Sequence, residues 1–218
     1  FSRFQNYTSV SNGSITSPNA WKIYSQMSSV KDSMVIRVSN GTTSANKKLF
    51  FHSTSWLGNT DSSWHNPQNW CNATIPSDSA IITISANTGY QPAISGVHNV
   101  KQLHLLTGAK LQITGTLKIS EMINGDSLSV DATQAILELN GNKNQSIDGR
   151  LFKEHRIQGF IVKNNSGIQI THRLVIDGYL QLAAGNLITN DQLYLSETAS
   201  IAASAAGTQI LGRVHAAN

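Results

Sequence analysis

The clearest pattern in this chain is a series of short segments, between about Val100 and Val214, in which apolar and polar residues alternate. Alternation with a period of two sends successive side chains to opposite faces of a strand, so each segment predicts a short β-strand with one buried and one solvated face. The segments lie at 102–105, 110–113, 116–119, 127–130, 136–139, 167–170, 174–176, 179–182 and 192–195.

The spacing of these segments decides between two all-β architectures. Glycine or asparagine separates them, and many follow one another after about six residues. A β-sandwich or β-barrel favours longer strands at a spacing of about 8–12 residues. Closer spacing is typical of a coil in which each turn adds two or three short strands to parallel sheets. The sequence therefore predicts an all-β, right-handed parallel β-helix, with four to six turns of about 20–28 residues between residues 100 and 214.

A tryptophan-rich stretch precedes the regular segments. Trp56, Trp64 and Trp70 lie among Asn, Pro, Gly and Ser residues, and an apolar strand is predicted at 81–84. Large aromatic rings, when buried, order loops that lack regular backbone pairing. We therefore expect residues 50–99 to form a β-rich, Trp-containing cap, which covers the apolar side chains and unpaired strand edges at the N-terminal end of the coil.

The first 49 residues have a mixed pattern without a sustained helical period. The best strand lies at 33–38, and a second candidate lies at 21–24. We interpret residues 1–49 as a small β-rich segment or the tail of a preceding domain. Residues 50–218 are then one β-helix domain, with its turns at 100–214.

Composition and charge narrow the expected partners. Charged residues make up 13% of the chain, against about 25% in ordinary globular proteins. The net charge of +4 comes from 16 basic and 12 acidic residues, and Lys47-Lys48 is the one adjacent basic pair that stands out. Scattered charges of this kind describe a solvated surface. We therefore expect no nucleic-acid partner.

Cysteine content and hydropathy set two further expectations. Cys71 is the only cysteine, so the chain can form no intramolecular disulfide and no site of clustered thiolates. No apolar run approaches the length of about 20 residues that spans a bilayer, so we expect no membrane insertion. The abrupt start at Phe1 and end at Asn218 lead us to expect a processed piece of a longer protein.

Neither the histidines nor the acidic residues form a recognisable reactive motif. The histidines stand singly, without the spacings of metal ligands, at 52, 65, 98, 104, 155, 172 and 215. Acidic residues that could align across turns, as in polysaccharide lyases and hydrolases, are Asp126, Asp131, Glu138, Asp148, Asp177 and Asp191. Asp126, Asp148 and Asp177 each adjoin a glycine, which is typical of turns. We expect no catalytic residue, metal or cofactor, and no enzymatic activity.

Four aromatic residues are candidates for a ligand-binding site. Trp56, Trp64, Trp70 and Tyr90 could form a platform on which sugar rings stack. The other interpretation, which we favour, is that these four residues close the open end of the coil.

The tryptophan-rich stretch also resembles a known family. Trp56-Leu57-Gly58, Trp64, the segment 66–70 and Ile75-Pro76 are similar to the opening of repeat regions in large secreted surface proteins of Bacteroidota. Many of those proteins are adhesin-like and exported by the type IX secretion system. Further segments that fit the family pattern are 91–94, 100–103, 108–111, 144–147, 167–170 and 178–187, so that the resemblance covers about residues 53–214.

The resemblance implies a function and a location. It implies a non-enzymatic module of a large adhesin-like protein, secreted or held at the cell surface, which acts as a stalk or as an adhesive surface. The implied partners are surface glycans or other cell-surface proteins, together with the secretion machinery during export. The C-terminal sorting domain typical of the family is not within these 218 residues. An alternative is a carbohydrate-binding or polysaccharide-degrading β-helix that uses an outward groove.

Overall fold

A computed structural model describes the backbone of residues 5–6, 25–26, 33–39, 44–50 and 53–217, and the side chains of 54–217. The chain divides into two compact units, Phe1–Phe51 and His52–Asn218. In the first unit, β1 (Gln5–Asn6) pairs with β2 (Ser25–Gln26), and β3 (Ser33–Ser39) pairs with β4 (Ser44–Phe50), both antiparallel. The strand predicted at 33–38 is confirmed as β3. The strand predicted at 21–24 lies outside the described residues.

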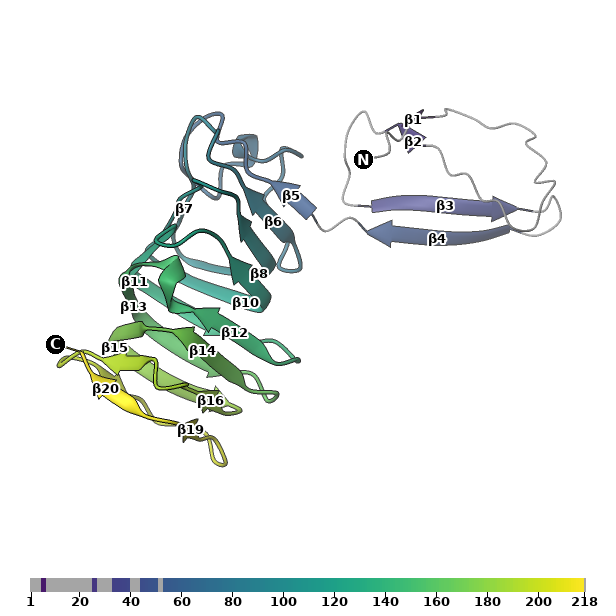
Figure 1. Ribbon diagram of the computed structural model, residues 1–218. Coiled ribbons are helices and arrows are strands. Elements are labelled where there is room, and N and C mark those ends of the chain that lie inside the picture. Colours follow the sequence, from purple (N-terminus) through teal and green to yellow (C-terminus); the bar gives the residue numbers. More distant parts are fainter. Residues whose placement is uncertain (1–4, 7–24, 27–32, 40–43, 51–52, 218) are drawn as a thin grey trace. The chain divides into compact units, whose positions relative to one another are not determined.

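The second unit is a parallel β-solenoid of about seven turns (Figure 1). Its first strands are β5 (Ser53–Ser55), β6 (Ile81–Ile84), β7 (Ala93–Ile94), β8 (Val97–Leu105), β9 (Leu111–Ile113), β10 (Thr116–Asn124), β11 (Val130–Leu139) and β12 (Gln145–Asp148). They are followed by β13 (Phe152–Lys163), β14 (Ile168–His172), β15 (Leu174–Ala184), β16 (Leu187–Ile188), β17 (Leu193–Leu195), β18 (Ser200–Ile201), β19 (Ile210–Leu211) and β20 (Val214–Ala216). Between residues 53 and 217 there is no α-helix, and the short 3-10 helices are η1 (Pro67–Asn69) and η2 (Gly149–Leu151).

The register of the strands confirms the predicted parallel β-helix. Leu117 pairs with Leu137, Leu137 with Phe160, and Phe160 with Leu180, so each turn adds 20 to 23 residues. Every one of these pairings is parallel and joins neighbouring turns. The coil already includes the stretch before Val100, because β5 pairs with β6 and β6 pairs with β8.

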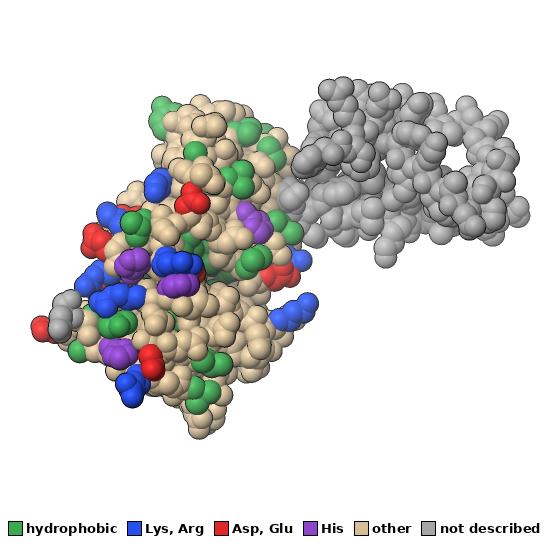
Figure 2. All heavy atoms as spheres, in the orientation of Figure 1, with side chains coloured by type: hydrophobic (Ala, Val, Ile, Leu, Met, Phe, Trp, Pro, Cys, Tyr) green, Lys and Arg blue, Asp and Glu red, His purple; other side chains and the backbone are tan. Residues whose placement is uncertain are grey.

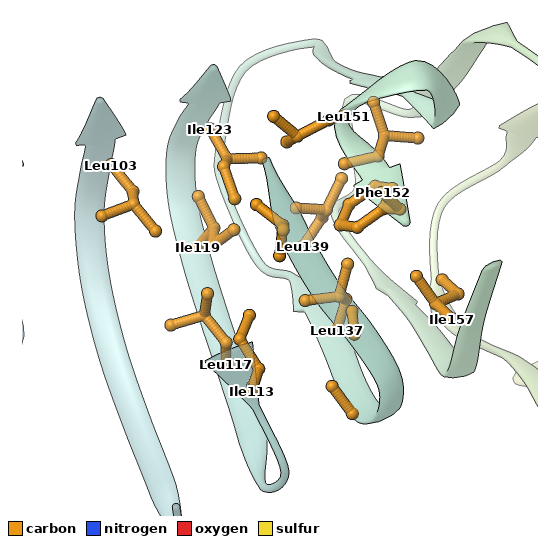
Figure 3. Close-up of a cluster of buried hydrophobic side chains, with 14 of the residues drawn as sticks. Leu103, Ile113, Leu117, Ile119, Ile123, Leu137, Leu139, Leu151, Phe152 and Ile157 are labelled. Carbon is orange, nitrogen blue, oxygen red and sulfur yellow. The ribbon is translucent and has the colours of Figure 1, made fainter. Parts of the chain in front are cut away.

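The core runs along the axis of the coil. The alternation at 116–119 puts Leu117 and Ile119 inside, where both are fully buried, and leaves Thr116 and Lys118 partly exposed. Side chains from successive turns stack into columns between the sheets (Figure 3). A buried aliphatic or aromatic side chain of this size contributes about 1.5–3 kcal/mol. The buried columns, to which each strand adds inward side chains, therefore stabilise the coil.

Two details differ from the sequence-based expectations. The predicted strand at 127–130 is wrong in its first part, because Leu128 has a φ of 56° and donates its backbone N–H to Arg150 in the next turn. Strands also continue around corners that carry no glycine. In β10 the register shifts between Ile119 and Met122, so that one strand bends to serve two sides of the coil.

Candidate functional site

The three tryptophans predicted as cap residues form one cluster in the loop between β5 and β6. The ring centroids of Trp56 and Trp64 lie 6.3 Å apart in a stacked arrangement. Trp70 meets both rings edge-on, at 5.0 Å from Trp56 and 4.6 Å from Trp64. Each tryptophan is 1% exposed and belongs to the same hydrophobic core as the inward residues of the strands. The predicted N-terminal tryptophan cap is confirmed.

Polar contacts lock the loop that carries this cluster. The indole N–H of Trp70 donates to the carbonyl oxygen of Trp64 at 2.9 Å. Asn69 is fully buried, and its side-chain oxygen accepts the backbone N–H groups of Thr60 and Asp61. Hydrogen bonds from the side chain of Asn66, the backbone of Ser63 and the side chain of Asn69 hold the pKa of Asp61 below its usual value. The loop is thus ordered by its own side chains.

This geometry sets what the four aromatic candidates can do. A sugar stacks on an open ring face, whereas the rings of Trp56, Trp64 and Trp70 pack against one another and are buried in the core. Tyr90 is 49% exposed, so it does not close the coil as predicted, and its backbone carbonyl oxygen accepts the Trp56 indole N–H. The structure therefore brings the tryptophans together as packing and leaves Tyr90 outside the group.

The acidic residues considered above are engaged with neighbouring turns. Lys or Arg forms six ion pairs with Asp or Glu among the described residues, and five of them join two turns: Lys101–Glu121, Lys118–Glu138, Lys153–Asp131, Arg156–Asp177 and Lys163–Glu138. The sixth, Arg150–Asp148, is local to η2. The His172 imidazole lies 3.1 Å from the Asp148 carboxylate across one turn, a contact that is an ion pair only when His172 is protonated. Asp126 accepts the backbone N–H of Gly108, and Asp191 accepts that of Arg213, each across one turn.

The titration of two of these carboxylates reflects the same contacts. Burial alone would raise the pKa of Asp131, but hydrogen bonds from Lys153 and Thr133 outweigh it and hold that pKa below its usual value. The pKa of Asp148 is also lowered, because hydrogen bonds from Arg150 outweigh the effect of burial. Asp148 caps η2 by accepting the backbone N–H of Arg150, which confirms its predicted role in a turn.

One carboxylate on the outside of the coil is nevertheless buried. Glu138 is 5% exposed, although its neighbours Leu137 and Leu139 occupy the inward positions of β11. Its oxygens lie 3.3 Å from the ammonium of Lys118 and 3.9 Å from that of Lys163. Burial, with a smaller effect from the charge of Glu138, raises the pKa of Tyr179 above its usual value. Nothing in the local sequence around Glu138 indicates this burial.

A second arrangement that the sequence did not reveal lies on another outer side of the coil. The guanidinium carbon of Arg173 is 3.9 Å from the centre of the Tyr194 ring, and the His215 imidazole stacks with that ring at 4.8 Å. Histidines gather beside lysines and arginines over the middle and C-terminal turns (Figure 2). We call Arg173, Tyr194 and His215 the outer aromatic column; it offers hydrogen-bond donors and a stacked cation to a polar ligand.

The remaining histidines do not converge on a metal site. Between residues 54 and 217, no group of three or more His, Cys, Asp or Glu side chains is arranged to hold a metal ion. His104 of β8 instead bonds Asn124 and Gln102. His65 and His98 form a pair with ring centres 4.5 Å apart, and burial of its ring lowers the pKa of His98. Within the described ranges, no helix has the length and apolar character needed to cross a membrane.

Comparison with known proteins adds no relative to this picture. No protein-family model matches the chain, and neither a curated protein nor a solved structure matches it. The structure therefore supports the resemblance described above in its fold, a parallel β-solenoid, and identifies no family.

Proposed function

We propose that this chain is a non-enzymatic module of a large adhesin-like protein, secreted or held at the cell surface, where it serves as a stalk or adhesive surface. The observation that carries the proposal is that five ion pairs on the outside of the coil join neighbouring turns. Charged side chains that could otherwise converge on a bound substrate instead form ion pairs between neighbouring turns, along the axis of the coil.

The physical reason for a supporting role is the one-dimensional construction of the coil. Each turn of a solenoid contacts its neighbours, so stability is the sum of turn energies and of interfaces between turns. Stacked apolar columns, such as Leu117 on Leu137, join neighbouring turns, and ion pairs such as Lys118–Glu138 add to the interfaces between the middle turns. Both terms resist bending and separation of the turns, which is what a stalk requires.

The proposed cellular setting comes from the resemblance of residues 53–214 to repeat regions of Bacteroidota surface proteins. The buried cluster of Trp56, Trp64 and Trp70 supports this assignment, because the residues that carry the resemblance are those that close the coil. Type IX export, with contact to the secretion machinery, follows as part of the same proposal.

Incubation of the purified full chain with acidic and neutral polysaccharides tests the non-enzymatic part. The expected result is that no new reducing ends or unsaturated products form. Cleavage that is abolished by Asp131→Asn or Asp177→Asn, in a chain that still folds, would refute the proposal. Asp61→Asn is a matched control, because Asp61 lies in the tryptophan loop and its partners are within that loop.

A carbohydrate-binding role is the second candidate, and the outer aromatic column favours it. Arg173 over Tyr194 presents a guanidinium supported by a ring, a combination that binds sugar hydroxyls and carboxylates. A glycan array probed with the full chain and with Arg173→Ala distinguishes the two roles. The control is Lys143→Ala, which removes a positive charge at another exposed position. Binding that is lost in Arg173→Ala and kept in Lys143→Ala supports the glycan role, whereas a blank array favours the stalk.

A further inference from the structure

An insertion in β13 forms a strained bulge on the outside of the coil. Between two successive pairs of the β11–β13 register, β11 has one residue where β13 has four, at 153–156. The two middle residues of the bulge, Glu154 and His155, have φ values of 54° and 59°. A left-handed backbone is strained at residues other than glycine, and such strain is concentrated at functional sites. The side chains that this bulge positions are therefore candidates for a binding role.

The bulge brings the ring of His155 back to the 3-10 helix η2. The Nδ1 atom of His155 lies 3.2 Å from the backbone carbonyl oxygen of Gly149. Because a carbonyl oxygen only accepts hydrogen bonds, Nδ1 carries the proton, and in the neutral ring Nε2 is then a hydrogen-bond acceptor. The charged residues on either side of the strained pair are held by carboxylates of neighbouring turns. The bulge thus presents an imidazole acceptor beside η2.

The next turn brings a second imidazole to the same place. The Nδ1 atom of His172 lies 3.1 Å from the carboxylate of Asp148, the residue that caps η2. This carboxylate also fixes the proton on Nδ1, so that Nε2 of the neutral His172 ring is again an acceptor. The two turns approach closely because Gly149 has no side chain: a Cβ there would overlap the backbone carbonyl oxygen of Arg173. Two oriented imidazoles and Arg173 are therefore held around η2.

Arg173 supplies a cation that no carboxylate neutralises. Within residues 54–217, no Asp or Glu oxygen lies within 4 Å of its guanidinium, whereas Arg150 is paired with Asp148. Arg173 is exposed, and its guanidinium carbon lies 3.9 Å from the centre of the Tyr194 ring, which supports it. An exposed, supported and unpaired guanidinium is well suited to bind a carboxylate through two parallel hydrogen bonds.

We infer that these three residues, His155, His172 and Arg173, which we call the η2 corner, bind a glycan built of uronate sugars. The sugar hydroxyls donate hydrogen bonds to the two Nε2 atoms, and a sugar carboxylate binds the guanidinium. The corner spans neighbouring turns, which are about 4.8 Å apart, so the glycan lies along the axis of the coil. This inference rests on the carbohydrate-binding role proposed above, and adds to it the place of the site and the class of sugar.

The chemistry of the η2 corner favours uronates over neutral and over heavily sulfated glycans. A neutral glycan offers hydroxyls to the imidazoles but no anion to Arg173. A heavily sulfated glycan has few free hydroxyls, and its dense negative charge is repelled by Asp148 and by the exposed Glu154 of the bulge. A uronate sugar carries one carboxylate together with free hydroxyls, which matches the groups that the corner presents.

Titration calorimetry of the full chain with polygalacturonate, dextran and heparin tests the inference. We expect polygalacturonate to bind, and dextran and heparin to bind more weakly by a factor of about ten or more. Arg173→Ala should weaken polygalacturonate binding by a factor of about ten, the size of one charge-assisted hydrogen bond. Lys143→Ala, which removes a positive charge at another exposed position, should keep the affinity.

The strained pair of the bulge offers a matched comparison. His155→Gly removes the imidazole and also relieves the backbone strain, because glycine accepts a positive φ. It should weaken polygalacturonate binding while the chain remains folded, as denaturation can check. Glu154→Gly relieves the same kind of strain at the neighbouring residue but keeps the imidazole, so binding should be unchanged or tighter.

The outcomes separate this inference from the role on which it rests. Equal binding of polygalacturonate and dextran, or polygalacturonate binding that Arg173→Ala and His155→Gly leave unchanged, would overturn the inference but not the carbohydrate-binding role. Heparin binding that is tighter than polygalacturonate binding and is lost in Arg173→Ala would reveal a general anion site, and the inference would be wrong. If none of the three polymers binds, both the inference and the carbohydrate-binding role fail.

Discussion

The indole N–H of Trp56 donates a hydrogen bond to the backbone carbonyl oxygen of Tyr90 at 2.7 Å, and so joins two parts of the chain that are 34 residues apart. Gly58 occupies the space beside this bond. It has a φ of 58°, and a Cβ at this position would overlap the Tyr90 carbonyl oxygen and lie 2.7 Å from the Trp56 indole nitrogen. The absence of a side chain at Gly58 is therefore a condition for closing the tryptophan cluster.

Gly58→Ala should destabilise the coil by at least about 2 kcal/mol, because it adds a clash with backbone to the strain of a left-handed residue. Urea denaturation followed by tryptophan fluorescence measures the change. Gly207→Ala is the matched control: Gly207 also has a positive φ, of 80°, but a Cβ there meets nothing within 4 Å. The control should cost about 1 kcal/mol. Equal losses in the two variants would contradict the steric role of Gly58.

Leu137→Ala should lower the free energy of unfolding by about 2–5 kcal/mol, because it removes buried methyl groups from the middle of a stacked column. Thermal and urea denaturation measure this loss. Leu128→Ala serves as the comparison, since Leu128 is exposed, and it should change stability by less than about 0.5 kcal/mol. A small effect of Leu137→Ala would mean that the columns contribute little to the coil.

Asn164→Ala should cost about 1–3 kcal/mol through the loss of buried hydrogen bonds. The side-chain amide of Asn164 donates to the carbonyl oxygen of Lys143 at 2.7 Å and to the side-chain oxygen of Gln145 at 2.8 Å. Without it, the Lys143 carbonyl oxygen loses its side-chain donor inside a corner of the coil. Asn165→Ala, at an exposed position, should leave the denaturation midpoint unchanged. A neutral Asn164→Ala would show that water replaces the amide.

Acidification should destabilise the cap through His98. Burial of its ring lowers the pKa of His98 below the ordinary value of 6.5, and the nearby His65 lowers it further. The unfolded chain then binds the proton more readily than the folded chain does. The stability that His98 contributes is complete above about pH 6.5 and is lost as the pH falls below this value towards the lowered folded pKa. The hydrogen bond between His98 and the backbone of Ser95 opposes the shift, and the charge of Asp78 opposes it more weakly.

Denaturation midpoints at pH 7.5 and pH 5.0 measure this effect. His98→Gln should reduce the difference between the two midpoints, whereas His104→Gln, outside the tryptophan cluster, should keep it. An unchanged difference in His98→Gln would assign the acid sensitivity to other groups.

Alternation was enough to predict the core, but not how the turns align. Leu117, Leu137 and Leu180 each lie inward as their two-residue period predicts, and the tryptophans close the coil. The burial of Glu138 depends on register between turns that differ in length, which places it beside Lys118 and near Lys163. Arg173, Tyr194 and His215 meet for the same reason, because Tyr194 and His215 pair in successive turns. Short segments with the same alternation of apolar and polar residues do not reveal how one turn is shifted relative to the next. The strand predicted at 127–130 was wrong around Leu128. Ser127-Leu128-Ser129-Val130 has the alternation of a strand, but the backbone at Leu128 has a positive φ and forms a turn.

The parallel stacking of the turns has a mechanical consequence. Each turn of about 20 residues advances the coil by only about 4.8 Å, the spacing between neighbouring strands. Once detached, the same 20 residues can extend to about 70 Å. A single turn that detaches under load therefore lengthens the chain by more than ten times the axial distance that the turn occupied in the coil. A module built in this way stays short and stiff at low tension and yields in discrete steps at high tension, which limits the force that reaches whatever it is attached to.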